Sequence, residues 1–358
     1  MRAAGARTLQ PVPAITDGRI IIRAPLAGDS QLLIAGRDTE FYRFMGAGSD
    51  NPEPSACIVV DGEIVGWVDF DAELDWLGAG EVNIGYSVFA AHRGNGFAAR
   101  AVRLLMHHLA VNGVYNNAVL LIDITNVLSL AVARRCGFIH ERDTQSNRLF
   151  RAPIPSLAPS DGKVSIRRQS PADLDADLDA KDAEQMRWLW LPEHRIQWQA
   201  MDTAQRRAHA LGALRASQDA FGYGPKWAFS VDTEDARCIA YVDCDLANDQ
   251  VPAGEANISY ACSPAHRGGG LTARAVRLVL RFLAEHTAAR QAHIIVDARN
   301  IASLRVARAV HAGLVERWFT AAGHEMIRHV ARIDGQAGSF APNALAPAHF
   351  ALNLDAES

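Results

Sequence analysis

Apolar residues gather into three strand-like stretches early in the chain. Residues 56–60 (ACIVV) and 63–71 (EIVGWVDFD) flank Asp61-Gly62, a dipeptide that favours the tight turn of a β-hairpin. Residues 81–88 (EVNIGYSV) form the next strand-like stretch. We therefore predict three consecutive strands, joined as an antiparallel meander.

The pattern then takes on a helical period. Past residues 93–96, apolar side chains recur every three or four positions, at Ala98, Val102, Leu105 and Leu109. Residues 118–123 (AVLLID) predict a short central strand, and residues 129–135 predict a helix that ends at Gly137. A mostly antiparallel sheet with one late β-α-β unit belongs to the α+β class, and not to the doubly wound folds.

The second half of the chain repeats the first. AHRGNGFAARAVRL at 91–104 matches AHRGGGLTARAVRL at 265–278, an offset of 174 residues. Between 81–133 and 255–307, 24 of 53 positions are identical, and a period this long is no solenoid repeat. The pattern predicts two domains of one fold, fused after a duplication.

A proline-rich stretch separates the two copies. Residues 152–163 (APIPSLAPSDGK) carry three prolines, which disfavour regular structure and stiffen a linker. A turn followed by an alternating strand opens each copy, as DGRIIIR and DGKVSIRR. We predict an N-terminal domain over 17–151, a linker over 152–163, a C-terminal domain over 164–333 and a weakly patterned tail over 334–358.

Composition narrows the classes of function. The 358 residues are 49% hydrophobic and 21% charged, which is typical of a globular protein with a sizeable core. No apolar run approaches the roughly 18 residues of a membrane span, and the N-terminus lacks the apolar block of a secretory signal, so we expect a cytoplasmic protein without a membrane partner. The net charge of −4 argues against a nucleic-acid partner.

The cysteines and other ligand-type residues indicate no metal. Five cysteines are an odd number and show no CxxC spacing, so we expect reduced thiols. No cluster of His, Cys and Asp has the spacing of a metal site, and we predict none.

The stretch Arg93-Gly94-Asn95-Gly96-Phe97-Ala98 lies between a predicted strand and a predicted helix. Glycines let the backbone approach an anion, and the free N–H groups and the dipole of a helix start attract it. Gly94-x-Gly96-x-x-Ala99 also fits the dinucleotide-binding fingerprint, but that motif follows the first strand of a parallel unit, whereas this stretch follows an antiparallel meander. The pattern predicts a phosphate cradle.

This loop resembles the pyrophosphate loop of the GNAT (GCN5-related N-acetyltransferase) superfamily, Arg/Gln-x-x-Gly-x-Gly/Ala. The second copy departs from it only in the last position, where Thr272 stands. The resemblance implies that acetyl-CoA is the acyl donor and that it is held by Val88, Arg93, Gly94, Asn95, Gly96, Phe97 and Ala98 in the first copy and by Arg267, Gly268, Gly269, Gly270, Leu271 and Thr272 in the second.

The family's next landmark is an Asn followed by a helix that closes on Gly-Phe. Asn126-x-x-Ser129 leads to Gly137-Phe138, whereas in the second copy two extra residues separate Asn300-x-x-Ser303 from Gly313-Leu314. The resemblance implies that Asn126 and Asn300 also contact the cofactor. The Asn-x-x-Ser pattern, with Glu-x-Asn-Ile-x-Tyr before the loop, is similar to the branch of ribosomal-protein N-terminal acetyltransferases.

The resemblance implies direct attack of a primary amine on the acetyl thioester. The ammonium must lose a proton, and the leaving thiolate must gain one. Many family members donate the second proton from a Tyr seven residues after the Asn, but Ala133 and Ala307 stand there. We predict Ser129 and Ser303 as substitutes; the alternative is that they only cap or orient the helix.

Glu81 and Glu255 are the candidate bases. Each is expected to begin the strand before the loop, on the face of Asn83 or Asn257 by alternation. Some family members carry a glutamate on this strand, but here it lies one residue further from the loop, which changes its face unless a bulge intervenes. The alternative is an exposed carboxylate at the end of a strand.

Two acidic pairs are candidates for binding the acceptor. Asp69 with Asp71, and Asp243 with Asp245, project from one face of a strand, where they either hold a cationic amine or form a solvated face. A longer segment before this strand distinguishes the second copy. Its Trp188 and Trp190 either line an acceptor pocket or fill a local core.

These features favour an N-acetyltransferase that acts on a small-molecule amine, with the second copy as the catalytic one and both loops binding acetyl-CoA. Two alternatives stay open, namely a protein or peptide N-terminal acetyltransferase and a non-catalytic acyl-CoA-binding tandem. A homodimer also stays open.

Overall fold

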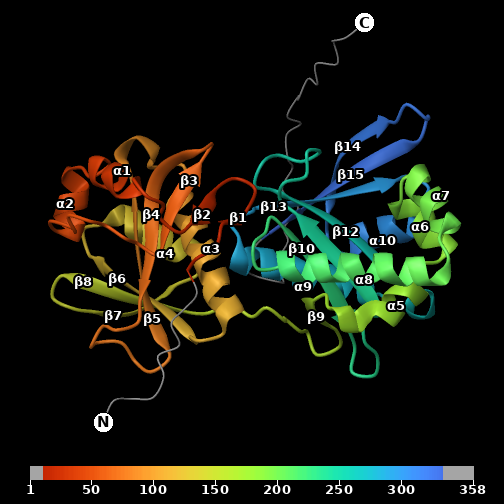
Figure 1. The fold of residues 1–358 in the computed structure, drawn as a ribbon, viewed down its shortest axis with the longest axis horizontal. Helices are drawn as coiled ribbons and strands as arrows, with labels where there is room; N and C mark the ends of the chain where they lie inside the picture. Colours follow the sequence, from red (N-terminus) through yellow and green to blue (C-terminus); the bar gives the residue numbers. More distant parts are fainter. Residues whose placement is uncertain (1–10, 334–358) are drawn as a thin grey trace, which may run out of the picture.

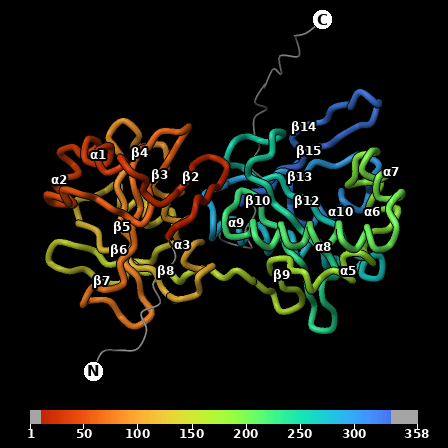
Figure 2. The backbone as a smooth tube through the Cα atoms, viewed as in Figure 1, coloured from red at the N-terminus to blue at the C-terminus, as the bar shows by residue number. Residues whose placement is uncertain are grey.

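Two sheets, one in each half of the chain, organise residues 11–333, the part that the computed structural model describes (Figure 1). The first half of the chain, red to yellow, and the second half, green to blue, occupy opposite ends of the molecule (Figure 2). Both sheets are mixed and carry helices, so the predicted α+β class with two domains is confirmed. The predicted tail over 334–358 lies outside the described residues.

The N-terminal domain is built on an eight-stranded sheet in the order β1-β2-β3-β4-β5-β6-β8-β7. Its strands are β1 Ile15–Thr16, β2 Ile21–Arg23, β3 Ala56–Val60, β4 Glu63–Asp71, β5 Glu81–Val88, β6 Asn117–Asp123, β7 Ile139–Asp143 and β8 Asn147–Pro153. Its helices are α1 Asp29–Ala35, α2 Thr39–Met45, the 3-10 turn η1 Ala90–His92, α3 Phe97–Asn112 and α4 Val127–Arg135.

The predicted meander forms because its turn residues adopt the backbone conformation that a tight hairpin needs. Asp61 and Gly62 have φ of 49° and 86°, and they join β3 to β4 in antiparallel pairing. β5 then pairs antiparallel with β4, as predicted. The expected end of α4 is also found, because Gly137 has φ of 79° just after the helix.

The C-terminal domain has a seven-stranded sheet in the order β14-β15-β13-β12-β11-β10-β9. Its strands are β9 Ser165–Arg168, β10 Lys226–Asp232, β11 Ala240–Asp245, β12 Ala256–Cys262, β13 Gln291–Asp297, β14 Gly313–Phe319 and β15 Glu325–Arg332. Its helices are η2 Pro171–Asp173, α5 Leu174–Ala180, α6 Ala183–Leu189, α7 Pro192–Ala200, α8 Thr203–Ala220, η3 Pro264–His266, α9 Leu271–His286 and α10 Ile301–Ala309. The long segment that distinguishes the second copy thus forms α5 to α8, with α6 and α7 at the far right of Figure 1.

One parallel contact in each sheet sets the position of the site. β5 pairs with β6 only from Glu81 to Asn83, and β12 pairs with β13 only at Ala256 and Asn257. Beyond these positions the two strands diverge, although each stays paired with its antiparallel neighbour. The divergence opens the sheet beside the glycine loop that follows β5 or β12.

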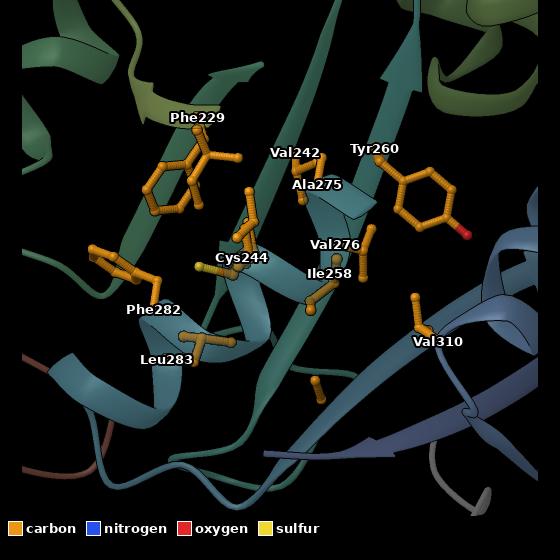
Figure 3. Packing of buried hydrophobic residues seen from close by; sticks show 14 of the residues in the cluster. Phe229, Val242, Cys244, Ile258, Tyr260, Ala275, Val276, Phe282, Leu283 and Val310 are labelled. Carbon is orange, nitrogen blue, oxygen red and sulfur yellow. The ribbon is translucent and has the colours of Figure 1, made fainter. Parts of the chain in front are cut away.

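One long helix, α3 or α9, packs against each sheet and contributes buried side chains to its core. In the C-terminal domain, α9 buries Val276, Phe282 and Leu283 against Val242 and Cys244 of β11 (Figure 3). Burying such side chains contributes about 1.5–3 kcal/mol each. The Tyr260 hydroxyl lies at the edge of this cluster, away from Phe282 (Figure 3).

The two domains meet along α3 and α9. The Arg103 guanidinium of α3 donates to the carbonyl oxygens of Ala284 and Thr287, which belong to the last turn and the end of α9. A second hydrogen bond between the domains runs from the N–H of Thr16 to the carbonyl oxygen of Tyr223, at 3.0 Å. Equivalent helices of the two copies therefore form the interface.

Candidate active site

The two glycine loops have the geometry of an anion cradle. α3 begins after Gly96 and α9 after Gly270, with φ of 79° and 72°, a conformation that favours glycine. Neither helix has a side-chain cap at its start or an acidic residue in its first turn. A Cβ built on either glycine would contact nothing within 4 Å. The N–H groups of each first turn are therefore open to an anionic group.

A cavity lies in front of each loop. The cavity of the N-terminal domain has a volume of about 260 Å³, and that of the C-terminal domain about 910 Å³. The predicted cofactor residues that line the first are Val88, Arg93, Gly94, Gly96, Phe97, Ala98 and Asn126, and those that line the second are Arg267, Gly268, Gly270, Thr272 and Asn300. Asn95 and Gly269 of the loops and Leu271, the first residue of α9, lie outside the cavity walls.

The two cavities differ in how far they reach through the opened sheet. The smaller one is bounded by α2, the end of β5, the loop and α4. The larger one is lined by residues from both faces of β12, including Tyr260 on the α9 side and Asn257 and Ser259 on the other side. It continues to Ile295 and Asp297 of β13. The N-terminal cavity touches the corresponding face of β5 only at Ser87 and does not reach β6, so the C-terminal cavity extends further through the divergence.

The Arg93 side chain is held by a helix of its own domain. Its Nη atoms lie 2.7 and 2.8 Å from the carboxylate of Asp38, and its Nε donates to the carbonyl oxygen of Val88 at 3.0 Å. Asp38 also caps α2, accepting from the N–H of Phe41. The guanidinium lowers the pKa of the Asp38 carboxyl to about 2. Arg93 thus joins α2 to the loop, in addition to lining the cavity.

Arg267 makes the same connection in the C-terminal domain. Its guanidinium lies 2.7 and 2.9 Å from Asp182 and 2.9 Å from Glu184, at the start of α6. Asp182 caps α6 by accepting from the N–H of Gln185, and Arg267 lowers the pKa of its carboxyl. The sequence alone did not identify Asp38 or Asp182 as site residues, because they precede the loop by 55 and 85 residues.

Asn126 and Asn300 cap the helices that follow the opened strands. Each amide oxygen accepts from the N–H of the Ser three residues later, at 3.0 Å. Ser129 and Ser303 therefore do not cap these helices themselves, and both line their cavities. Their role as proton donors stays a prediction.

Two tyrosines that the sequence analysis did not single out also line the cavities. The Tyr86 hydroxyl donates to the carbonyl oxygen of Ser129 at 3.4 Å, and the Tyr260 hydroxyl donates to that of Ser303 at 3.1 Å. Burial raises the pKa of both phenols, so both stay protonated. Their signal was present in the sequence, because they occupy equivalent positions in EVNIGY and EANISY.

The two candidate bases have different partners. Glu81 begins β5 as expected, and its carboxylate lies 2.6 Å from the Arg151 guanidinium. Glu255 precedes β12, which begins at Ala256, and its carboxylate lies 2.6 Å from Nε2 of His293. The expectation that Glu255 begins the strand was wrong by one residue, because the preceding turn, in which its N–H donates to the carbonyl oxygen of Pro252, ends there.

The acidic pairs lie outside the cavity walls. Asp69 accepts from the N–H of Ser55 at 2.9 Å, and Asp71 from the N–H of Glu73 at 2.8 Å. In the C-terminal domain, Asp243 lies 3.3 Å from the Lys226 ammonium, and Asp245 accepts from the N–H of Ala247 at 2.9 Å. These contacts hold turns and neighbouring strands together. Binding of an acceptor amine by these carboxylates stays a prediction without support from the cavities.

Trp188 and Trp190 line the C-terminal cavity, and α6 and the start of α7 form one wall of it. Trp198 behind them is buried, packs edge-on against Trp190 with ring centroids 5.3 Å apart, and belongs to the local core. The aromatic segment therefore both lines a cavity, with Trp188 and Trp190, and fills a local core, with Trp198.

Within residues 11–333, no group of three or more His, Cys, Asp or Glu side chains is placed to hold a metal ion. Over the same residues, none of the helices has the length and apolar character needed to cross a membrane. The arrangement as a whole suits a phosphate-bearing ligand, held by backbone N–H groups at one end of a largely apolar cavity.

Comparisons with known proteins agree with this geometry. A family model described as "Acetyltransferase (GNAT) domain" matches residues 19–139 and 163–312. A search of curated proteins finds no match.

Solved structures of similar fold each cover about half of the chain. One is an acetyltransferase from Salmonella typhimurium that modifies the N-terminal serine of ribosomal protein L7/L12, with 17% identity, coverage of 49% of this chain and 98% of that one, and a TM-score of 0.39. Another is a ribosomal-protein-S5-alanine acetyltransferase from Vibrio fischeri, with 13% identity, 50% and 98% coverage and a TM-score of 0.41. A third is the microcin C7 self-immunity acetyltransferase MccE in complex with acetyl-CoA and AMP, with 12% identity, 49% and 94% coverage and a TM-score of 0.36.

Proposed function

The chain belongs to the GNAT acetyltransferase family, and on that premise we propose that it transfers an acetyl group from acetyl-CoA to a primary amine of a small molecule, in the cavity of its C-terminal domain. The N-terminal domain binds acetyl-CoA at its own loop and does not carry out the transfer. Both domains use the same backbone cradle for the pyrophosphate.

The observation that carries this proposal is the reach of the C-terminal cavity. Transfer needs the thioester and the amine to approach one another from the two sides of the opened strands. The cavity of about 910 Å³ has walls on both sides of β12, from Tyr260 to Asn257, and its volume falls in the range of small-molecule sites. The smaller cavity of about 260 Å³ touches the corresponding side of β5 only at Ser87 and does not reach β6, so it leaves less space for an acceptor.

In this proposal each group has a defined task. The N–H groups at the start of α9 bind the pyrophosphate, because the helix dipole and the free donors favour negative charge there. The Ser303 hydroxyl lies in the cavity wall beside the Asn300 cap and donates toward the leaving thiolate. Glu255 removes the proton from the acceptor ammonium, through water, because it lies beside the cavity and not in its wall.

A protein or peptide N-terminus is the second candidate acceptor. Leu191 in the cavity wall is 56% exposed and Ile196 on the same helix segment is 68% exposed, which provides an apolar surface that a peptide could contact outside the cavity. A small molecule would leave this surface uncovered. An assay that compares small-molecule amines with a peptide therefore distinguishes the two candidate acceptors.

Two matched substitutions test the assignment of the domains. Ala98→Glu and Thr272→Glu each place a carboxylate in the first turn of α3 or α9, where the site of the pyrophosphate is predicted. A Glu in the first turn is compatible with helix stability, so the effect should fall on anion binding and not on folding. Calorimetric titration with acetyl-CoA measures the number of sites, and a thiol-release assay measures turnover.

The acceptors are spermidine, tyramine, glucosamine and a tetrapeptide with an N-terminal alanine. We expect two binding sites in the unmodified protein, one of them lost in each variant, and turnover lost with Thr272→Glu. Turnover lost with Ala98→Glu alone would place catalysis in the N-terminal domain. Acetylation of the peptide only would select the second candidate acceptor, and binding without turnover would select a non-catalytic tandem.

A further inference from the structure

We propose that His293 is a positioning residue for the acceptor's deprotonation: it fixes the Glu255 carboxylate beside the cavity and shares the proton that leaves the ammonium. This inference rests on the proposed function and deepens it, because it explains how only one of the two domains handles that proton. His293 is not one of the motif positions that identify the family.

The geometry places the pair next to the cavity floor. Nε2 of His293 lies 2.6 Å from Oε2 of Glu255, and the His293 side chain is only 6% exposed. His293 pairs with Asn257 at the last position before β12 and β13 diverge. Asn257 and Ile295, which follow Glu255 and His293 by two residues, both line the cavity. Two residues of a strand span about 6.6 Å and share a face, so one or two water molecules connect the pair to the cavity.

Two buried atoms at this point have no partner. Nδ1 of His293 and Oδ1 of Asn257 are both buried without a hydrogen bond. Buried polar atoms are normally satisfied by protein or by ordered water, so these two atoms mark the place where water or a ligand group binds. When Nε2–H donates to the carboxylate, Nδ1 presents a lone pair. It can then accept a hydrogen from water that is bonded to the acceptor ammonium.

The N-terminal domain lacks this arrangement at the equivalent positions. Val119 occupies the position of His293, at the same offset of 174 residues. Glu81, the equivalent of Glu255, pairs with Arg151 at 2.6 Å. A guanidinium has only N–H donors and accepts no hydrogen, so Arg151 offers no counterpart to the Nδ1 lone pair of His293. The smaller cavity also does not reach β6. The Glu255–His293 pair therefore lies in the domain whose cavity has more space for an acceptor.

The proton balance closes without any further reagent. One N–H bond of the acceptor ammonium breaks, and the proton passes through water to the Glu255–His293 pair. The neutral amine then attacks the thioester carbonyl, its C–N bond forms and the C–S bond breaks. The second proton lost by the nitrogen and the proton held by the pair go to the thiolate and to solvent.

The test uses the full chain with the amine of the panel above that is acetylated fastest, over a pH range from 6.5 to 10. His293→Val copies the N-terminal domain, and His293→Gln can still donate to Glu255 but cannot take up a proton. Arg151→Gln removes the partner of Glu81 and is the matched control outside the catalytic domain. Thermal unfolding and acetyl-CoA titration accompany each variant.

We expect both His293 variants to lower kcat about 100-fold at neutral pH, because Glu255 then lacks the group that shares its proton and general-base catalysis contributes about 10²- to 10⁴-fold. The loss should shrink toward pH 10, because the acceptor amine then loses its proton to solvent. The dissociation constant of acetyl-CoA should stay within twofold, and Arg151→Gln should keep its turnover. A purely structural role of His293 would instead give a constant loss at every pH, in parallel with a lower melting temperature.

Either a constant loss of that kind, or turnover of His293→Gln equal to that of the unmodified protein, would overturn the inference and leave the proposed function intact. Absence of turnover in the unmodified protein with every amine of the panel would overturn the proposed function itself. The two failures are therefore distinguished by the unmodified protein alone.

Discussion

Nδ1 of His107 on α3 lies 3.0 Å from Nδ1 of His286 on α9, in the buried interface between the two domains. The remaining ring nitrogens face carbonyl oxygens, Nε2 of His107 that of Phe221 at 3.3 Å and Nε2 of His286 that of Ser156 at 3.1 Å. A carbonyl only accepts, so the three contacts require three ring hydrogens, whereas two neutral imidazoles carry two. While both imidazoles are neutral, only two of these three contacts can therefore be hydrogen bonds.

This pair makes the stability of the interface depend on pH. Burial lowers the pKa of His107 to about 4 and also lowers the pKa of His286, beside the Arg103 guanidinium. An unfolded histidine has a pKa of about 6.5, so between pH 6.5 and 4 the unfolded chain binds protons that the folded chain does not. The free energy of unfolding should fall by about 2 kcal/mol from pH 7 to 5 for His107 alone.

Urea denaturation at pH 7 and pH 5 measures this change. The double variant His107→Phe with His286→Phe removes both titrating groups from an environment that already contains Trp227 and Phe282. We expect its stability to change less with pH than that of the unmodified protein. An equal pH dependence in both proteins would assign the acid sensitivity to other groups, such as the buried His108, whose pKa burial also lowers.

The contact between Arg267 and Asp182 is expected to strengthen cofactor binding. Asp182→Asn keeps the cap of α6, since Asn caps as well as Asp, and removes only the charge. The loop then loses its link to α6 except through Glu184. We expect the dissociation constant of acetyl-CoA at the C-terminal site to rise about 2- to 5-fold, the range of a partly exposed ion pair. Tighter binding would show instead that Asp182 competes with the phosphate for Arg267.

The hydroxyl of Tyr260 is expected to stabilise the C-terminal domain and to orient Ser303. Tyr260→Phe removes a buried hydrogen bond to the Ser303 carbonyl oxygen, which costs about 1 kcal/mol. Because Ser303 lies in the cavity wall, kcat should fall as well, whereas the KM for acetyl-CoA should change little. Tyr86→Phe makes the same deletion in the N-terminal domain and is the matched control for the loss of stability. An unchanged kcat in Tyr260→Phe would show that the hydrogen bond from Tyr260 does not contribute to turnover.

The five free cysteines are expected to react with a disulfide reagent at very different rates. Burial raises the pKa of Cys57 and Cys238 to about 11 and raises that of Cys244 well above its usual value. Only the thiolate reacts, so at pH 8 these three should modify slowly in the folded protein. Burial also raises the pKa of Cys136 and Cys262, but these two side chains are partly exposed, so they should react first. Spectrophotometric counting of thiols in native protein and in guanidinium chloride checks this order, and rapid reaction of all five without denaturant would contradict it.

The local sequence pattern was sufficient to predict the main strands and helices and the phosphate-binding glycine loop. The hairpin turn at Asp61-Gly62, the strand of EVNIGYSV and the helix start after Gly96 each depend on the conformational preferences of a few neighbouring residues. The offset of 174 residues then implied that both halves share one fold, and the loop motif implied the family. These features were determined by the sequence alone, because the turn, the strand, the helix start and the loop are each specified by neighbouring residues and the repeat is a direct match of residue types.

The partners of the charged side chains were decided only by the tertiary structure. Arg93 meets Asp38 and Glu255 meets His293 across 55 and 38 residues, and no local pattern specifies which carboxylate a given cation will reach. Likewise, the acidic pairs alternate on their strands as predicted, but the opened part of the sheet lies beside other residues. The C-terminal cavity owes one of its walls to α6 and the start of α7, whereas α2 bounds the smaller cavity. Such long-range packing follows from the whole core, and it is what distinguishes two domains whose loops are nearly identical in sequence.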